Sequence, residues 1–165
     1  MNSLKSIFDQ KISLINLNDV EITKIDELEW IANELENNRQ IHFINWHSNQ
    51  SMVDKNPEIK NRILTRLVSN LLNDKKNDKV IDLSHFFNID IDYLKIFTQA
   101  IKNETQTMVG QVILGEQNEA LSQSKEWSQL LSCLSGNNHI LNEIKRKDYF
   151  AFEILKHLSF LDYKN

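Results

Sequence analysis

The strongest hydrophobic pattern in this chain lies between residues 56 and 72. Its apolar side chains recur every three or four positions, as they do on the buried side of an α-helix. These residues are Ile59, Ile63, Leu64, Leu67, Val68, Leu71 and Leu72. Asn56 can cap the start of such a helix, and Pro57 fits its first position. The apolar stripe covers more than half of the helix circumference, so we predict a central helix with neighbours on two sides.

Helical patterns before and after this segment predict an all-α fold. The expected helices cover about residues 3–15, 25–36, 80–87, 91–102, 104–114, 120–134 and 139–161. The sequence contains Gly 3 times and Pro once, and this low content disfavours a series of tight β-hairpins. No internal repeat and no domain linker is evident. We therefore predict a single-domain multi-helix bundle, residues 1–165, of about six to eight helices.

The stretch from Ile41 to Trp46 has no decisive period. A run of mostly apolar residues this short does not distinguish a strand from a turn of helix. A strand here would have no evident partner in a chain of helices. We therefore predict helical or irregular structure for residues 41–46.

The length and composition are those of an ordinary globular protein. The chain has 165 residues, of which 41% are hydrophobic and 25% charged, and its formal net charge is −4. The single cysteine, Cys133, excludes an intramolecular disulfide and a zinc site built from several cysteines. No apolar run is long enough to span a membrane, and the N-terminus lacks a secretory pattern. We expect a soluble, cytoplasmic protein without a membrane partner.

The sequence lacks the patterns that would indicate catalysis or metal binding. No two of its five histidines stand three or four positions apart. His42 and His47 lie close to Trp46, but a metal there would need ligands from elsewhere in the chain. There is also no glycine-rich phosphate loop and no G-x-S-x-G motif. We predict that the protein is not an enzyme and has no catalytic residue, metal or cofactor.

Residues 80–97, VIDLSHFFNIDIDYLKIF, have features of a helix-turn-helix motif. Asn88 suits the turn between two crossing helices. The piece FFNIDIDYL resembles the end of the five-helix domain of Xre-type repressors, and this resemblance implies DNA binding near residues 80–103. However, Asp90 and Asp92 would stand at the leading end of the reading helix, where they repel phosphates. A DNA-binding regulator is therefore the alternative function, and nucleic acid is not the expected partner.

The segment from Asp19 to Glu36 is strongly acidic, with seven Asp or Glu residues and one Lys. On the helix expected there, Trp30 is turned away from the apolar side. The polar residues around Trp30 are Asp26, Glu27, Glu29, Asn33 and Glu34. Trp is enriched at protein-binding hot spots but is normally well buried. Either this group forms a partner-binding face, or another part of the chain covers Trp30.

Three classes of function remain open. The preferred one is a small acidic protein that binds and inhibits a basic protein, as an immunity protein or antitoxin neutralises a toxin or nuclease. The second is the DNA-binding regulator, and the third is an enzyme whose site is scattered along the sequence. Retention on heparin or DNA at low salt would favour the regulator over the protein binder.

Overall fold

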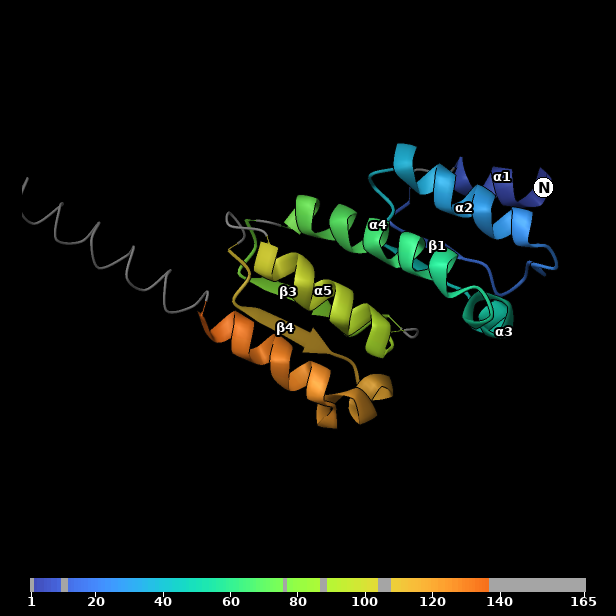
Figure 1. The fold of residues 1–165 in the computed structure, drawn as a ribbon. Coiled ribbons are helices and arrows are strands. Elements are labelled where there is room, and N and C mark those ends of the chain that lie inside the picture. The colour runs from blue at the N-terminus through green and yellow to red at the C-terminus, as the bar shows by residue number, and fades with distance from the viewer. Residues whose placement is uncertain (1, 10–11, 76, 87–88, 104–107, 137–165) are drawn as a thin grey trace, which may run out of the picture.

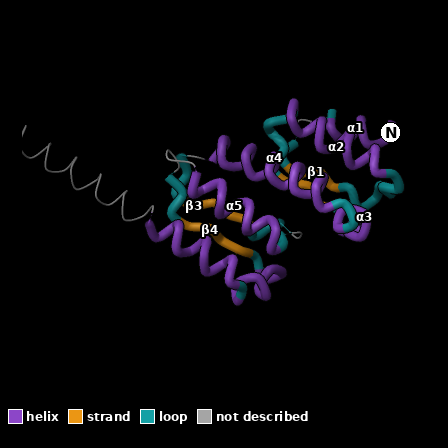
Figure 2. The backbone as a smooth tube through the Cα atoms, viewed as in Figure 1, coloured by secondary structure: helices purple, strands orange, loops and turns teal. Residues whose placement is uncertain are grey.

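The fold alternates helices with very short strands. The computed structural model of the protein describes residues 2–9, 12–75, 77–86, 89–103 and 108–136. In chain order the elements are α1 (Asn2–Phe8), β1 (Leu14–Asn16), α2 (Ile25–Asn37), β2 (Phe43–Asn45), the 3-10 turn η1 (His47–Asn49), α3 (Gln50–Asp54), α4 (Pro57–Lys75), β3 (Val80–Leu83), α5 (Ile91–Asn103), β4 (Gln111–Leu114) and the 3-10 helix η2 (Glu116–Gln123). A further helix covers residues 125–136. The described part of the chain is thus mostly helical, with short strands set among the helices (Figure 2).

The strands form two separate parallel pairs. β1 pairs with β2, with Leu14 opposite Phe43, and β3 pairs with β4, with Val80 opposite Gln111. A parallel pair needs a connection that carries the chain back to the end of the pair where it started. α2 makes this return in the first pair and α5 in the second, while α4 links the two β–α–β units. As a result, α2, α4 and α5 pack side by side in chain order (Figure 1).

α4 is the central helix that the hydrophobic pattern predicts. All seven apolar residues of its stripe are buried, and α2 and α5 pack on its two flanks. The buried side-chain amide of Asn70 donates hydrogen bonds to the backbone oxygens of Asn38 and Ile41. These bonds hold α4 against the loop that leads into β2.

The prediction of an all-α fold is wrong at four places. Strands β3 and β4 lie within the stretches 80–87 and 104–114, and β1 overlaps the end of the stretch 3–15, where the sequence pattern predicts helix. β2 lies within 41–46, where we expected helical or irregular structure. Each strand has only three or four residues and is stabilised by pairing with a strand distant in the sequence. Such pairing leaves no local signal, so the apolar periodicity alone points to the wrong element.

The helix-turn-helix prediction is wrong because its first helix is replaced by β3 and a turn at residues 84–86. Its second helix is confirmed as α5, and the helix expected at 25–36 is confirmed as α2. The helix expected at 120–134 is present from residue 125, after η2. The last predicted helix, 139–161, lies outside the described residues. None of the helices described above combines the length and apolarity needed to cross a lipid bilayer.

Replacing Leu67 tests the central position of α4. Leu67 is 2% exposed, so Leu67→Ala should lower the free energy of unfolding by about 2–5 kcal/mol through lost burial and a residual cavity. Thr65→Ala, on the exposed side of the same helix, is the matched control and should change it by less than about 0.5 kcal/mol. Both values come from chemical denaturation. Equal midpoints for the two variants would contradict the central packing of α4.

Candidate functional site: the open strand face

Strands β1, β3 and β4 present one side to the helices and the other side to solvent. The residues on the helix side are buried, and they are Ile15, Ile44, Ile81, Leu83 and Val112. Because side chains alternate along a strand, the intervening residues point to the opposite side. The apolar residues there are Leu14, Val80 and Ile113, which are 38%, 41% and 39% exposed. We call this side, which also carries the exposed side chains of Asn16, Asp82 and Gln111, the open strand face.

An uncovered face is unusual for parallel strands. Crossover helices normally cover both faces of a parallel sheet, so its strands are buried on both sides. Here every second residue of β1 and of β3 is exposed. In β2, by contrast, Phe43 stands opposite Leu14 and is buried against Phe86. Exposed aliphatic side chains that share an uncovered surface can be buried by a second molecule. The open strand face is therefore the candidate functional site.

The loop that leaves β2 is fixed by the buried side chain of Asn49. Its amide oxygen accepts a hydrogen bond of 2.8 Å from the backbone N–H of Ile22. Its amide nitrogen donates to the backbone oxygens of Leu17 and Val20, at 2.9 and 2.8 Å. One side chain thus satisfies three backbone groups of the loop after β1. It ties the loops that follow β1 and β2 to each other.

Asn118 has the same place in the second β–α–β unit. Asn49 follows the last residue of β2 by four positions, and Asn118 follows the last residue of β4 by four. The buried amide of Asn118 donates a hydrogen bond of 2.7 Å to the backbone oxygen of Phe86, in the loop after β3. The backbone N–H of Asn49 donates to the backbone oxygen of Trp46, and that of Asn118 donates to the backbone oxygen of Gly115. Both bonds close a turn of the same kind. The two units are therefore structural repeats, and the expectation of no internal repeat is wrong.

A sequence signal for this repeat exists but is short. In both units an Asn follows the apolar strand residues, five positions after Ile44 in the first unit and five after Ile113 in the second. Successive strands are unequally spaced because α4, which links the two units, has 19 residues, while α2 and α5 within the units have 13 each. Unequal spacing hides the repeat from a search at a fixed period.

The edge of the molecule where the strands end is acidic. The N-terminal ends of α2, α4, α5 and helix 125–136 all lie on the right in Figure 1. The segments at this edge, residues 17–28, 46–60, 84–94 and 115–128, contain eleven Asp or Glu and four Lys. The rest of the chain contains twelve acidic and fifteen basic residues. Acidic residues favour helix N-termini because of the helix dipole, and together they give this loop edge a net charge of −7.

Lys60 is the buried cation of the loop edge. Its ammonium group lies 2.6 Å from an oxygen of Asp90, 3.0 Å from Asp54 and 3.2 Å from Asp92. Burial alone would lower the pKa of Lys60, but its bonds to the three carboxylates outweigh burial and raise the pKa above the usual value. Burial would raise the pKa of Asp54, but hydrogen bonds from Gln50 and Lys60 lower it. The cluster joins α3, α4 and the start of α5.

The acidic residues expected to form a partner-binding face on α2 are partly engaged inside the chain. Glu29 pairs with Arg62 of α4 at 2.6 Å, and Arg62 also donates to the amide oxygen of Asn33. The carboxylate of Glu27 accepts backbone hydrogen bonds at the start of α2. Asp26 is exposed, while Glu34 is half-buried. The structure thus brings these residues to α2 as expected, but arginines of α4 offset part of their charge.

Trp30 is partly covered by another part of the chain, which is the second of the two possibilities that the sequence leaves open. Its ring meets the ring of Phe8 edge to face, with centroids 5.2 Å apart and planes at 78°. The side chain is half-buried and packs against the core. α1 supplies this cover from a different part of the chain, which phasing within α2 does not reveal. Whether the remaining exposed part of Trp30 binds a partner stays a prediction.

The groups that could carry chemistry are dispersed. Within the described ranges, no group of three or more His, Cys, Asp or Glu side chains is arranged to hold a metal ion. His42 is buried and desolvation lowers its pKa, so it is neutral near pH 7, whereas His47 is exposed. Cys133 is a free thiol, half-buried against the core. None of these groups is among the exposed residues of the open strand face.

Comparisons with protein-family models, with curated proteins and with solved structures find no match for this chain. The functional argument therefore depends on the geometry alone.

The contact between Trp30 and Phe8 predicts a loss of stability on truncation. Trp30→Ala should lower the free energy of unfolding by about 1–3 kcal/mol, because it removes a half-buried ring and its edge-to-face contact. Trp30→Phe retains a ring at this position and should recover most of the loss. Thermal and chemical denaturation measure both changes. An unchanged midpoint in Trp30→Ala would show that the ring is exposed in solution.

The Lys60 cluster predicts a stability difference that depends on pH. Lys60→Met should lower the free energy of unfolding by about 1–3 kcal/mol at pH 7, a figure reduced because the three carboxylates are partly exposed. The lowered pKa of Asp54 contributes stability that is present above its ordinary value of 3.8 and is lost as the pH falls below it. The raised pKa of Lys60 contributes stability that is complete at pH 7 and is lost only above 10.5.

The gap between wild type and Lys60→Met should therefore be larger at pH 7 than at pH 3. Denaturant unfolding at the two pH values measures it. Lys95→Met is the control, since exposed Lys95 contacts only one of these carboxylates, Asp92, at 3.6 Å, and its effect should be small at both pH values. A gap that stays constant from pH 7 to pH 3 would mean that the cluster does not form in solution.

Proposed function

We propose that this protein binds another protein through the open strand face. The observation that carries the proposal is the exposure of Leu14, Val80 and Ile113 on a side of the parallel strands that helices leave uncovered. Exposed aliphatic residues on a stiff backbone can be buried by a partner at little cost in ordering. The surrounding polar side chains, such as Asn16 and Gln111, supply the hydrogen-bonding rim that protein interfaces contain.

The architecture supports a binding role. Strand-plus-helix units in which a buried Asn follows the second strand resemble, by analogy of architecture, leucine-rich repeats, which stack such units along one axis. The segment from Ile44 through Trp46 to Asn49 follows the apolar-x-apolar-x-x-Asn part of that pattern. Repeat arrays of this kind offer extended surfaces for partners. The analogy concerns the fold, so the proposal of binding depends on the exposed residues themselves.

The charge of the loop edge favours a basic partner. With a net charge of −7 beside the open strand face, the protein would attract a basic surface and speed the encounter. Asp26 and Glu27 belong to this edge, so part of the acidic group on α2 would act with the strand face. A basic toxin or nuclease is a partner of this kind, and occupation of its active surface by this protein would inhibit it. We therefore propose an inhibitory role for the complex.

Introducing a positive charge on the open strand face tests the proposal. Leu14→Lys and Ile113→Lys should each weaken partner binding at least tenfold, because each places a charge in the apolar part of the interface. Leu131→Lys is the matched control, since Leu131 is similarly exposed, at 44%, but lies on helix 125–136. All three variants should keep the thermal midpoint of the wild type within a few degrees. Partners captured from the native host by the wild type are identified, purified and titrated against each variant.

The outcomes separate the candidate functions. Loss of binding in the two strand variants but not in Leu131→Lys supports the open strand face. Equal binding by all variants places the interface elsewhere, and selective loss in Asp26→Ala would return it to α2. Binding of duplex DNA by the wild type at about 150 mM salt, with one sequence preferred, would replace the proposal by the regulator.

A further inference from the structure

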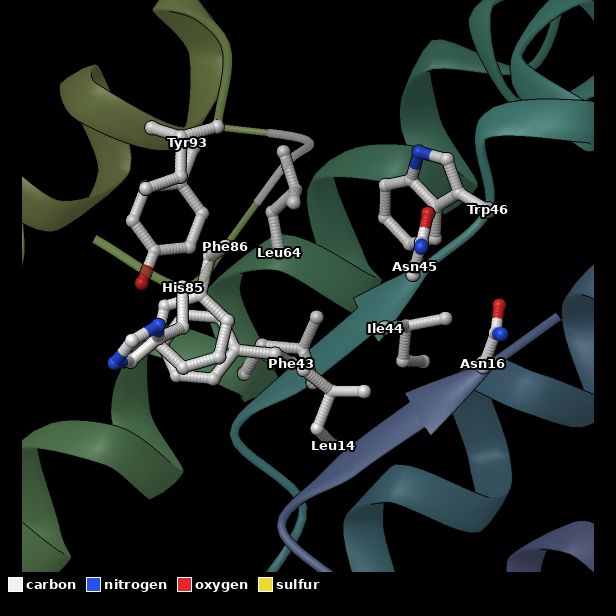
Figure 3. A pocket seen from close by; sticks show the side chains of 12 residues that line it. Leu14, Asn16, Phe43, Ile44, Asn45, Trp46, Leu64, His85, Phe86 and Tyr93 are labelled. Atoms are coloured by element: carbon white, nitrogen blue, oxygen red, sulfur yellow. The ribbon is translucent and has the colours of Figure 1, made fainter. Parts of the chain in front are cut away.

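β1 has a strand neighbour on one side only. Within the ranges that the structure describes, its sheet consists of β1 and β2. Leu14 and Asn16 lie on β1, opposite Phe43 and Asn45 of β2 (Figure 3). A strand with a single neighbour leaves a row of backbone N–H and C=O groups along its other edge.

The hydrogen bonds between the two strands show which backbone groups of β1 face β2. The backbone N–H of Phe43 donates to the oxygen of Ser13, and the backbone N–H of Leu17 donates to the oxygen of Asn45. In a parallel pair, alternate residues of each strand direct their backbone groups toward the neighbour. On β1 the residues that face β2 are therefore Ser13, Ile15 and Leu17.

The backbone groups of the intervening residues, Leu14 and Asn16, point away from β2. No backbone hydrogen bond joins these N–H and C=O groups to any other described residue. Both residues are exposed, Leu14 at 38%. We call these outward backbone groups of Leu14 and Asn16 the free edge of β1.

The free edge lacks the features that protect many edge strands from pairing. Natural edges often carry a charged residue or a proline. Residues 12–18, with the sequence ISLINLN, contain neither. The equivalent edge of β4 is less accessible, because Val112, whose backbone faces away from β3, is only 6% exposed. The free edge of β1 is thus the more accessible of the two outer edges.

An extended peptide backbone matches this edge. The outward groups of Leu14 and Asn16 repeat at the two-residue period of a strand, so a second extended chain can pair with both residues. Several families of peptide-binding domains hold their ligands by adding such a strand to a sheet edge. Alternate side chains of the added strand would lie on the open strand face, beside the side chain of Leu14.

The loop after β1 favours positive charge on the added segment. Asp19 and Glu21 are exposed and follow Asn16, the last residue of β1, by three and five positions. They belong to the loop edge, whose net charge is −7. Lys or Arg residues that flank the paired part of the segment would be attracted there.

We propose that the partner of this protein adds one extended segment to the free edge of β1. Its backbone pairs with Leu14 and Asn16, and a flanking basic residue lies beside Asp19 or Glu21. The proposal rests on the proposed function, since the segment belongs to the protein that covers the open strand face. It specifies how that partner is held, by backbone hydrogen bonds as well as by apolar contact.

A probe peptide tests the pairing on the full chain alone. The probe is acetyl-KKVTVTVKK-amide, and the control is the same peptide with a methyl group on each backbone nitrogen of its VTVTV part. Both have the same charge, but the control cannot donate the backbone hydrogen bonds of a strand. The unmodified probe should bind at least about tenfold more tightly than the control, the ratio expected for two lost hydrogen bonds.

Amide hydrogen exchange, followed by NMR, locates the bound probe. In the chain without probe, the amide of Ile15 should exchange slowly and those of Leu14 and Asn16 rapidly. Saturation with the unmodified probe should slow the amides of Leu14 and Asn16, while that of Val112 stays unchanged. Equal affinity of probe and control, or exchange at Leu14 and Asn16 that the probe does not slow, would overturn the proposal.

Two variants at one position isolate a single backbone donor. Leu14→Pro removes the outward N–H without removing a bond between β1 and β2, because proline is tolerated where the N–H faces away from the sheet. Leu14→Val retains the N–H and has a side chain of similar size. Leu14→Pro should bind the probe about three- to tenfold more weakly than Leu14→Val, the loss expected for one hydrogen bond. Equal binding by the two variants would contradict strand pairing.

Two other occupants of the free edge are outcomes of the same measurement. Slow exchange at Leu14 and Asn16 before any probe is added would overturn the proposal, because the edge would already be paired. Sedimentation then identifies the occupant: a dimer indicates a second copy of the chain, and a monomer indicates another segment of the same chain.

The probe titration needs no captured partner, so its failure differs from that of the proposed function. If Leu14→Lys and Ile113→Lys lose partner binding but the probe does not bind, the open strand face stands and strand pairing is overturned. If the probe pairs with β1 but no partner depends on the open strand face, strand addition is supported and the proposed function is overturned.

Discussion

The parallel pairing of strands is the constraint on which the rest of this structure depends. Two parallel neighbours must be joined by a long return connection, and here each return is a helix. α2, α4 and α5 follow one another in a row on the buried side of the strands. The same arrangement places the helix N-termini and their acidic residues at one edge, and it leaves the other strand side free. The open strand face and the charged loop edge thus have one common origin.

The sequence predicts the helices of this fold much better than its strands. α2, α4 and α5 have 13 or more residues each, which is long enough for the apolar period to be unambiguous. β1 consists of Leu14, Ile15 and Asn16 alone, and three residues carry no reliable period. Its stability comes from β2, whose pairing residues lie 29 positions later, for example Phe43 opposite Leu14. Pairing over this distance cannot be inferred from local pattern.

The site is less predictable than the fold for a related reason. Helical phasing is local, so it gives the side of α2 on which Trp30 lies, but it does not anticipate the cover from Phe8 of α1. It also does not show that Arg62 reaches Glu29 across the packed helices. The general prediction of an acidic surface survives at the loop edge, because charge composition is a property of the segments themselves. The buried roles of Asn49 and Asn118 become visible only when the loops are placed against each other.

The separation of the two strand pairs allows the two β–α–β units to differ in local stability. In the part of the chain that the structure describes, β1–β2 and β3–β4 share no ladder, and α4 is the element packed against both α2 and α5. Unfolding of the second unit would break the β3–β4 ladder, while the hydrogen bonds between β1 and β2 could stay intact. Amide hydrogens of β3 and β4 can then exchange with solvent through a partial opening that leaves those of β2 protected. In native-state hydrogen exchange the two β–α–β units would thus behave as separate foldons. α4 packs against the helices of both units, so it would belong to both foldons.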